Sequence, residues 1–560
     1  MISIKHLVFG AIAAISLPAT AQSTFESSGL GDIDPWGVGT LARSDGALPN
    51  TLWSNSDPEV LDDLFMRTNP RSMSPVAREL VARAVLSSAR RPDGADGDQL
   101  LRKRLNIIEN FGDLDVITEF VRQMNGVNGV PSAFELDVDR QFARGNLASA
   151  CSTVRATSQT SSYILNARAV CFALEGNIDS AELALELARE DGNQDIWFVK
   201  TIGMMGIENP RSKPEPKYDS GLKLALTLGA DLDIPEGGFP GLHPALAAEL
   251  ANRSDIPRDL RIRAADIAAF AGVMDLNAYR EVYRTEPMRI RARVPTITGE
   301  TIVIPENEGE ENPNPPVNPL DEALQASINP MMTEDEKAVA YRRAILSSRG
   351  DLDRYRVTAL TLMPEVQKLR TPDVFLRHGD VFALAAAVAN EPGLASRFLN
   401  RSVVEGGPEP DEFFIAWLNG IEILSGRDRS PQSALAVTTR LAETADEKTA
   451  IRAVQMIHMI MTLGGPASPE ARQFLQSAPA EVFTAGTDAS SKDIFLARAA
   501  LESDALGEGA MRTALLIGRD PSALNMFALA DLVDALKDNG FEDLARDLAL
   551  EGIRYHRPLD

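Results

Sequence analysis

Residues 145–190 read GNLASACSTVRATSQTSSYILNARAVCFALEGNIDSAELALELARE, and the fold that we expect follows from this stretch. A Gly-Asn-apolar signature occurs twice in it, at residues 145–147 and 176–178, on either side of an alanine-rich segment. Glycine suits the left-handed residue that follows one helix, and asparagine can cap the start of the next helix. The stretch therefore predicts a helical hairpin that is bounded by tight corners.

The same kind of corner recurs along the chain. Further copies, with Gly-Asp or a degraded dipeptide, begin at Gly112, Gly350, Gly379 and Gly540. The first three corners, at residues 112, 145 and 176, are 33 and 31 residues apart. Two helices per unit of about this length are typical of tetratricopeptide arrays. We therefore expect helix pairs to repeat along most of the chain.

Residues 176–185 (GNIDSAELAL) resemble the turn and helix start of a tetratricopeptide-like helix pair, in which small residues let helices stack. The resemblance covers residues 100–190 and is looser elsewhere. The family's Trp, Gly-Tyr and closing Pro do not stand at their set places, so no ligand-binding residues are carried over. The resemblance implies an all-α fold, a right-handed superhelical array of antiparallel helix pairs (a TPR-like α-solenoid) and a binding role with no substrate attached.

Composition agrees with a helical protein that extends over more than one compact core. The chain has 560 residues, of which 44% are hydrophobic and only 6% aromatic. A single core rarely fills this length, and few aromatic residues suit packed helices better than sheets. The formal net charge of −24 disfavours nucleic acids and anionic membrane surfaces as partners, because the field of the protein repels both.

The first 21 residues have the pattern of a secretory signal peptide. Lys5 precedes an apolar run over residues 7–15, and Ala19-Thr20-Ala21 forms a small-x-small cleavage site. The alternative is an N-terminal membrane anchor, but the run is shorter than the roughly 20 residues that a spanning helix needs. We expect an exported protein, periplasmic or secreted, with no integral membrane span after cleavage and an unknown oligomeric state.

Helix-breaking residues and helix-capping motifs indicate how the mature chain is divided into parts. Trp36 and Trp53 are expected to pin a Gly-, Ser- and Pro-rich segment onto the first helices, with an aromatic ligand platform as the alternative. Thr333 and Glu336 form a predicted capping box. The expected parts are a signal peptide (1–21), an extended N-terminal arm (22–55), helical-repeat region 1 (56–285), a hairpin-like and acidic Pro-rich, disordered central linker (286–332) and helical-repeat region 2 (333–560).

Cys151 and Cys171 are the only cysteines of the chain. An even count in an exported protein favours a disulfide. If two antiparallel helices turn near residues 157–160, the two cysteines are nearly equidistant from the turn and face each other. The sequence therefore predicts a disulfide between them.

No catalytic, cofactor-binding or metal-binding residue is predicted. The four histidines beyond the signal peptide, His243, His378, His458 and His556, lack zinc-site spacing, and no nucleotide-loop or nucleophile motif is present. His378 as a general base and a calcium loop at residues 231–236 are the weaker alternatives to local structural roles. We therefore expect a non-enzymatic protein without cofactors.

The expected function is a protein-binding scaffold or assembly factor of the cell envelope, with a protein partner in the envelope and no nucleic acid. Stacked helix pairs commonly bind other proteins. One alternative is an envelope glycan or peptidoglycan hydrolase with a superhelical body. Another is a structural component of an envelope machine such as a motility apparatus.

Overall fold

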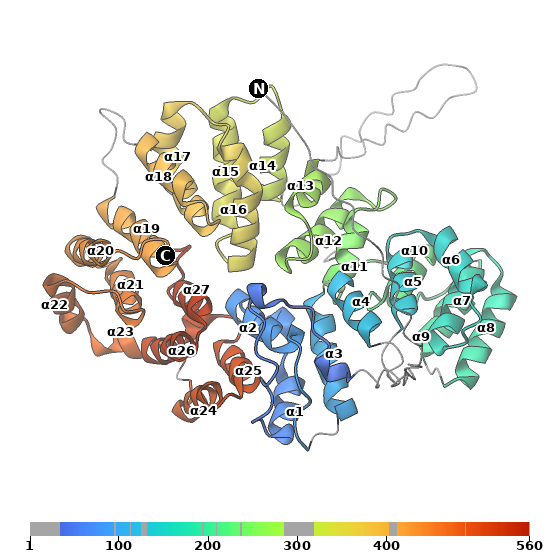
Figure 1. Cartoon of the computed structure of the whole chain (residues 1–560). Coiled ribbons are helices and arrows are strands. Elements are labelled where there is room, and N and C mark those ends of the chain that lie inside the picture. Colours follow the sequence, from blue (N-terminus) through green and yellow to red (C-terminus); the bar gives the residue numbers. More distant parts are fainter. Residues whose placement is uncertain are drawn as a thin grey trace, which may run out of the picture. The chain divides into compact units, whose positions relative to one another are not determined.

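A computed structural model describes residues 34–94, 97–112, 114–124, 132–192, 195–208, 210–235, 238–284, 318–402, 411–487 and 489–558. Within these residues the chain forms 27 α-helices and a few short 3-10 turns (Figure 1). The β-type pairing found there is an isolated bridge between Thr487 and Leu524. The described chain is therefore all-α, as the sequence predicted.

The part before residue 125 contains four helices and three short turns. Their bounds are η1 (Pro35–Gly37), η2 (Arg43–Asp45), α1 (Pro58–Arg67), η3 (Pro70–Ser72), α2 (Pro75–Leu86), α3 (Gly97–Phe111) and α4 (Leu114–Gln123). Six helices follow over residues 133–229. They are α5 (Ala133–Ala143), α6 (Leu147–Ala156), α7 (Ser162–Leu174), α8 (Ile178–Glu190), α9 (Ile196–Met205) and α10 (Gly221–Gly229).

The remaining helices lie on both sides of residues 285–317. Before them come α11 (Pro244–Ala251), α12 (Arg258–Phe270) and α13 (Leu276–Arg284). After them come α14 (Pro319–Ile328), α15 (Glu334–Ser347), α16 (Leu352–Val366), α17 (Pro372–Val388), α18 (Pro392–Ser402), α19 (Glu412–Leu424), α20 (Pro431–Thr444), α21 (Ala450–Thr462), α22 (Pro469–Ser477), α23 (Ala480–Thr484), α24 (Ser491–Glu502), α25 (Leu506–Ile517), η4 (Pro521–Ala523), α26 (Met526–Asp538) and α27 (Glu542–Gly552).

Left-handed glycines separate consecutive helices at four of the predicted corners. Gly112, Gly145, Gly176 and Gly540 have φ angles of 83°, 77°, 80° and 84°. Glycine adopts this conformation without the steric cost that a Cβ would bring. The corners predicted at these four positions are confirmed.

Side-chain caps agree with the predicted helix starts in most cases. Asn177 caps α8, because its Oδ1 accepts a hydrogen bond from Ser180 N at 3.2 Å. Both halves of the capping box between Thr333 and Glu336 are formed at α15. Asn146, in contrast, precedes α6 without a side-chain hydrogen bond to the helix.

The corner predicted at Gly379 is wrong, because this residue lies inside α17. The helix buries a nearly continuous apolar surface that includes Val374, Phe375 and Phe382. Burial of this surface outweighs the roughly 1 kcal/mol that glycine costs inside a helix. Gly350, in contrast, does lie in the turn between α15 and α16, as predicted.

The predicted linker over residues 286–332 needs correction at its end. Residues 319–328 form α14, which Asn318 caps and which buries Leu320, Ala323 and Leu324. This apolar spacing directly follows a Pro-rich segment, which hid it in the sequence. The rest of the predicted linker up to residue 317, with its hairpin and acidic stretch, lies outside the described residues.

A buried arginine holds the segment that precedes α1. Arg104 of α3 is fully buried and donates hydrogen bonds to the carbonyl oxygens of Trp36, Val38, Val85 and Ser87, at 2.8–3.1 Å. Its guanidinium also lies over the ring of Trp36, 5.5 Å from the centroid. A buried cation is tolerated only when its donors are satisfied, and backbone oxygens satisfy them here.

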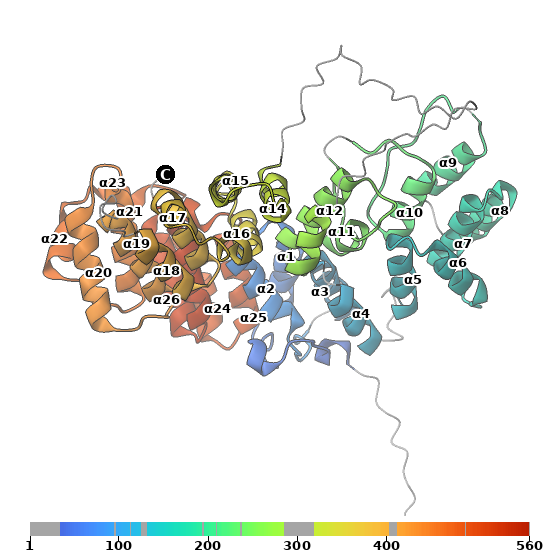
Figure 2. The ribbon, with the colours of Figure 1, turned by 90° about the horizontal axis from the view of Figure 1, so that it is seen from above.

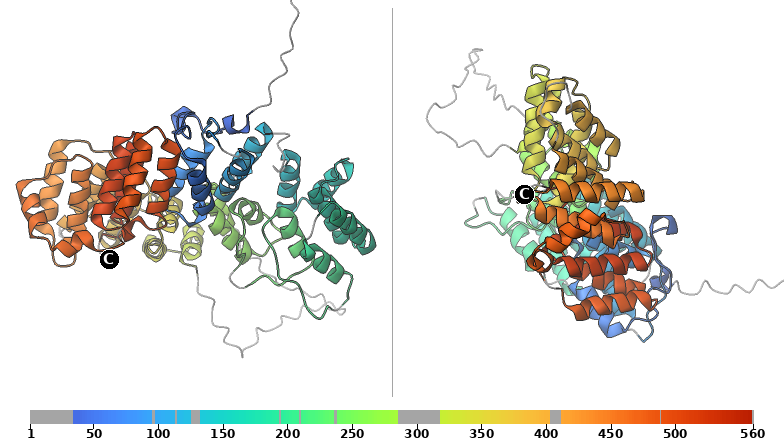
Figure 3. Two further views of the ribbon diagram at one scale, coloured as in Figure 1. Left: turned by 90° about the horizontal axis from the view of Figure 1, so that it is seen from below. Right: turned by 90° about the vertical axis from the view of Figure 1, so that its left-hand side faces the viewer.

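The first and last helices of the described chain pack against each other (Figures 1 and 3). α2 packs along α25 and also contacts α27, and α1 contacts α25. Ser74 N donates to Gly518 O at 2.8 Å. A Cβ at Gly507 would lie 2.4 Å from the Trp53 ring, so only glycine permits this approach. We call the packing of α1 and α2 on α25 and α27 the end-to-end contact.

The buried apolar side chains form two clusters. The larger one, the main core, joins helices from α1 to α27 and includes both sides of the end-to-end contact. The smaller one is centred on α5 to α10, which we call the disulfide module (residues 132–232; Figure 2). Arg140 and Arg144 of this module form ion pairs with Glu249 of α11, at 2.8 and 2.7 Å, and so join the two parts.

Candidate functional site

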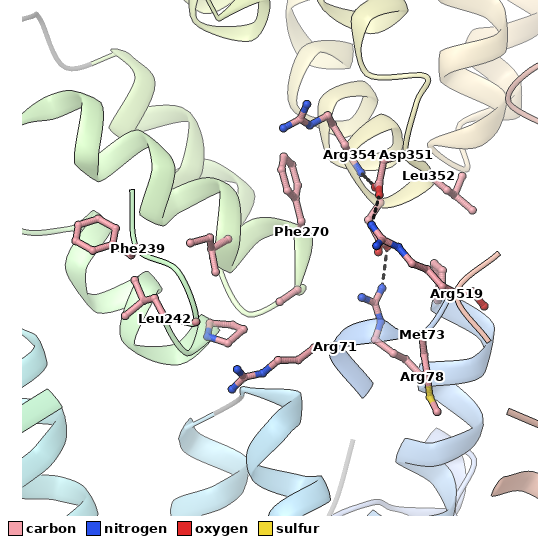
Figure 4. A pocket seen from close by; sticks show the side chains of 17 residues that line it. Arg71, Met73, Arg78, Phe239, Leu242, Phe270, Asp351, Leu352, Arg354 and Arg519 are labelled. Atoms are coloured by element: carbon pink, nitrogen blue, oxygen red, sulfur yellow. Dashed lines mark hydrogen bonds and ion pairs between the residues drawn. The ribbon is translucent and has the colours of Figure 1, made fainter. Parts of the chain in front are cut away.

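A cavity of about 640 Å³ opens where four remote parts of the chain meet (Figure 4). Its walls come from η3 and the start of α2, from residues 239–242 and the first residue of α11, from the end of α12 and from the start of α16. Arg519, between α25 and η4, completes it. We call this space the central cavity.

Four arginines line the central cavity and outnumber the two aspartates in its lining. Arg78 of α2 pairs with Asp353 of α16 at 2.8 Å, and Arg519 lies 3.8 Å from Asp351. The other two, Arg71 and Arg354, have no carboxylate within 4.0 Å among the residues that the structure describes. Neither arginine therefore has a direct ion-pair partner in the described part of the chain, although Arg354 interacts electrostatically with Asp266 of α12.

Arg71 is the more unusual of the two unpaired cations. Burial lowers the pKa of its guanidinium below the ordinary value, since part of its hydration shell is removed. Its Nε donates only a long hydrogen bond, 3.4 Å, to the carbonyl oxygen of Asn110. A desolvated cation with one weak neutral partner is a favourable place for an anion.

The opposite wall of the central cavity is apolar. Phe239, Leu242, Ile267 and Phe270 lie along it, and Figure 4 shows Phe239, Leu242 and Phe270 on the side that faces the arginines. The guanidinium of Arg354 lies over the ring of Phe270, 5.4 Å from the centroid. The cavity thus presents a cationic side and an apolar side to one ligand.

Smaller cavities extend the central cavity at both ends. One of about 360 Å³ shares Ser74, Asp351 and Arg519 with it and continues to Arg554 and Arg557. Another of about 210 Å³ shares Arg71 and Arg78 and continues towards the end of α3. Arginines therefore continue along a groove that is longer than the central cavity, and one of them, Arg554, pairs with Asp520 at 2.9 Å.

Two helix N-termini point at this groove. Ser74 and Asp351 are the capping residues of α2 and α16, and both line the central cavity. The free amides and the dipole of a helix make its N-terminus positive. Their caps already use part of this capacity, because Ala77 N donates to Ser74 Oγ and Arg354 N donates to the Asp351 carboxylate.

One internal carboxyl already occupies part of the α2 N-terminus. Glu551 of α27, only 6% exposed, accepts a hydrogen bond from Val76 N at 3.2 Å through its Oε1. Burial raises the pKa of this carboxyl to about 8. It is therefore largely protonated at neutral pH and adds little negative charge to the groove.

The central cavity has binding groups but no obvious catalytic arrangement. Its lining contains no histidine, cysteine, tyrosine or lysine among the described residues. Of its two carboxylates, Asp353 is paired with Arg78, and Asp351 accepts the capping hydrogen bond from Arg354 N at 3.0 Å. The described lining therefore combines cationic and apolar groups in one cavity.

The histidines lie apart from one another. His243 caps α11, accepting a hydrogen bond from Ala245 N at 3.3 Å, and its Nε2 contacts the carbonyl oxygen of Glu109. Burial and the nearby Arg71 lower the pKa of His243 to about 4, so it is neutral. His378 lies within α17 with no hydrogen-bond partner at either ring nitrogen. It lines none of the cavities described above.

The disulfide predicted between Cys151 and Cys171 is present, with the two Cα atoms 5.6 Å apart. It joins α6 to α7 inside the disulfide module. The corner predicted at Gly350 borders the smaller cavity of about 360 Å³, and Ser74, the cap of α2, lines both this cavity and the central cavity. The four arginines were not singled out, because nothing in the sequence indicates that residues 71, 78, 354 and 519 meet.

The described residues contain no group of three or more His, Cys, Asp or Glu side chains that could hold a metal ion. Among the described helices, none combines the length and the apolar character that crossing a bilayer requires. No protein-family model matches the chain, and neither a curated protein nor a solved structure is similar to it.

Proposed function

We propose that this protein is an exported, periplasmic scaffold or assembly factor that binds an acidic segment of a partner protein in its central cavity. The observation that carries the proposal is the pairing of an arginine wall with an apolar wall inside a strongly acidic chain. The stacked helix pairs would form a right-handed, tetratricopeptide-like superhelix, which exposes long surfaces to partners.

The chemistry of the two walls favours a peptide over a small inorganic anion. Arg71 and Arg354 can donate hydrogen bonds to two carboxylates, and hydrogen bonds to charged groups contribute about 1.5–3 kcal/mol each. Phe239, Leu242 and Phe270 can cover apolar side chains of the same segment. A volume of about 640 Å³ has room for a few side chains of a peptide.

Charge reversal in the central cavity tests the binding role. The probe is a fluorescent peptide that combines aspartate with phenylalanine, and its binding is measured by anisotropy at low and high salt. We expect wild-type protein to bind it in a salt-sensitive manner and Arg71→Glu/Arg354→Glu to lose at least about tenfold in affinity, or 1.4 kcal/mol.

A matched control uses an arginine elsewhere on the surface. Arg67 of α1 is exposed and pairs with Asp63 of the same helix at 3.1 Å. Arg67→Glu changes the net charge in the same direction and should leave peptide affinity within about twofold of wild type. Equal affinity of all three proteins would refute a role for the cavity. Export is tested separately by N-terminal sequencing of the mature protein, which we expect to begin at Gln22.

A further inference from the structure

α8 of the disulfide module has apolar residues on two opposite sides. One side, with Ala181, Ala184, Leu185 and Ala188, is buried in the module. On the other side Leu183 and Leu187 are 60% and 47% exposed and lie one helical turn apart. A helix at a protein surface ordinarily has a single apolar stripe, which faces the core.

The neighbours of α8 cover only its inward side. α7 packs extensively along α8, and α9 packs on it to a lesser extent. In Figure 1 α8 lies at the edge of its group of helices. Leu183 and Leu187 remain exposed even with all described neighbours in place.

Acidic side chains surround this exposed apolar stripe. Glu186 and Glu190 lie three residues after Leu183 and Leu187, so they share their side of the helix. Asp179 and Glu182 add two more exposed carboxylates, whereas Arg189 is the cation on the exposed side of α8. None of these four acids forms an ion pair within 4.0 Å in the described part of the chain.

The stripe is presented on a rigid support. α7, on which α8 packs, carries Cys171, and the disulfide to Cys151 ties it to α6. Asn177 caps the first turn of α8, which limits fraying next to Asp179. A preorganised surface loses little entropy when a partner binds.

We propose that this face of α8 is a docking surface for a basic amphipathic helix of a partner protein. Leu183 and Leu187 would pack on the apolar side of that helix, and the flanking acids would pair with its Lys and Arg residues. A second copy is a poor occupant, because a symmetric contact would place the same carboxylates opposite each other. An anionic lipid surface is repelled by the same charges.

The test uses the full-length protein and a labelled synthetic helix with leucine on one side and lysine on the other. Binding is followed by fluorescence anisotropy, and the site is located by hydrogen–deuterium exchange. We expect added protection in α8. Leu183→Gln/Leu187→Gln should weaken binding at least about tenfold. Glu182→Gln/Glu186→Gln/Glu190→Gln should weaken it comparably and flatten its salt dependence.

Matched variants distinguish a specific surface from general attraction to an acidic protein. Ile328 and Met331 are also exposed, at 49% and 87%, and lie at and just after the end of α14, outside the module. Ile328→Gln/Met331→Gln should bind the peptide within about twofold of wild type. All these side chains are exposed, so circular dichroism and melting temperature should stay unchanged.

Three results would overturn the proposal. The first is equal peptide affinity in the wild-type and α8 variants. The second is exchange protection that maps outside α8. The third is a dimer in sedimentation that Leu183→Gln/Leu187→Gln dissociates, since a second copy would then occupy the face. Arg71→Glu/Arg354→Glu should leave this binding unchanged, so the result does not depend on the central cavity.

Discussion

The main core and the disulfide module are stabilised in different ways. The main core joins residues that are far apart in sequence, and the bond from Val76 N to the Glu551 carboxyl spans 475 residues. The module is built from six consecutive helices and contains the disulfide between Cys151 and Cys171. Remote contacts need burial of a large apolar surface, because much chain entropy is lost when the ends meet.

The comparison shows that a large buried apolar surface and a local cross-link are alternative sources of stability. A small cluster buries less apolar surface, so a cross-link that restricts the unfolded chain adds a substantial share of its stability. The main core has no cross-link within the described residues and depends on the fit between α2 and α25. The two parts should therefore respond to different perturbations.

The largest expected effect comes from removing an aromatic side chain at the end-to-end contact. Trp53 is fully buried and packs edge to face on Phe65, with centroids 5.5 Å apart. Trp53→Ala should destabilise the main core by about 3–5 kcal/mol. In hydrogen exchange we expect lost protection in α1, α2, α25 and α27 together, while α6 to α8 keep theirs.

The reciprocal variant is Phe142→Ala, which removes a fully buried ring of the module. It should cost a similar amount but lower protection in α5 to α10 first. If either variant lowers protection evenly across both parts, the division into two stability units is wrong.

An effect of comparable size is expected from pH, and it should be confined to the main core. The pKa of Glu551 is raised from 4.5 to about 8 in the folded chain, so this carboxyl ionises more readily in the unfolded chain. Stability from this residue is complete below pH 4.5 and falls as pH rises to about 8. The loss is on the order of 4 kcal/mol.

Glu551→Gln keeps the shape and can still accept from Val76 N, but it cannot ionise. The variant should show a flatter dependence of unfolding free energy on pH and exceed wild type in stability above pH 8. Denaturant unfolding between pH 5 and 9 measures both. Parallel curves for the two proteins would show that Glu551 does not titrate in this range.

The smallest of the three effects is expected from removing the disulfide. Cys151 and Cys171 are 20 residues apart, and closing a loop of this size contributes about 3 kcal/mol in the chain-entropy model. Cys151→Ala/Cys171→Ala should therefore increase exchange in α6, α7 and α8. Wild type treated with a reductant should reproduce the pattern, and unchanged exchange in α2 and α25 serves as the internal control.

The sequence predicted local features better than remote ones. Corners at Gly112, Gly145, Gly176 and Gly540 follow from the backbone preference of glycine, which acts within one turn. The corner predicted at Gly379 is wrong because the apolar side chains around it in α17 are buried by tertiary packing, which keeps this residue inside the helix. The backbone preference of glycine ends a helix only where burial of the neighbouring apolar side chains does not favour continuing it.

The candidate site could not be predicted from the sequence for the same reason. The corner at Gly350, which precedes α16, is a local signal and is predicted from the sequence. No sequence motif contains Arg71 or Arg354, and the two residues line one cavity only because η3 and α16 come together. The Leu183 and Leu187 stripe lies within a recognised helix, but its exposure depends on which neighbours α8 has.

The separation between Val76 and Glu551 also has a consequence for biosynthesis. A ribosome that adds 5–20 residues per second needs roughly 25–95 s to extend the chain from one residue to the other. During that interval the apolar face of α2, including Leu80 and Val81, lacks the helices that later cover it. The apolar face of α2 therefore stays without its final partners until the C-terminal helices have been made, whereas α6 to α8 need only neighbours that are close in sequence.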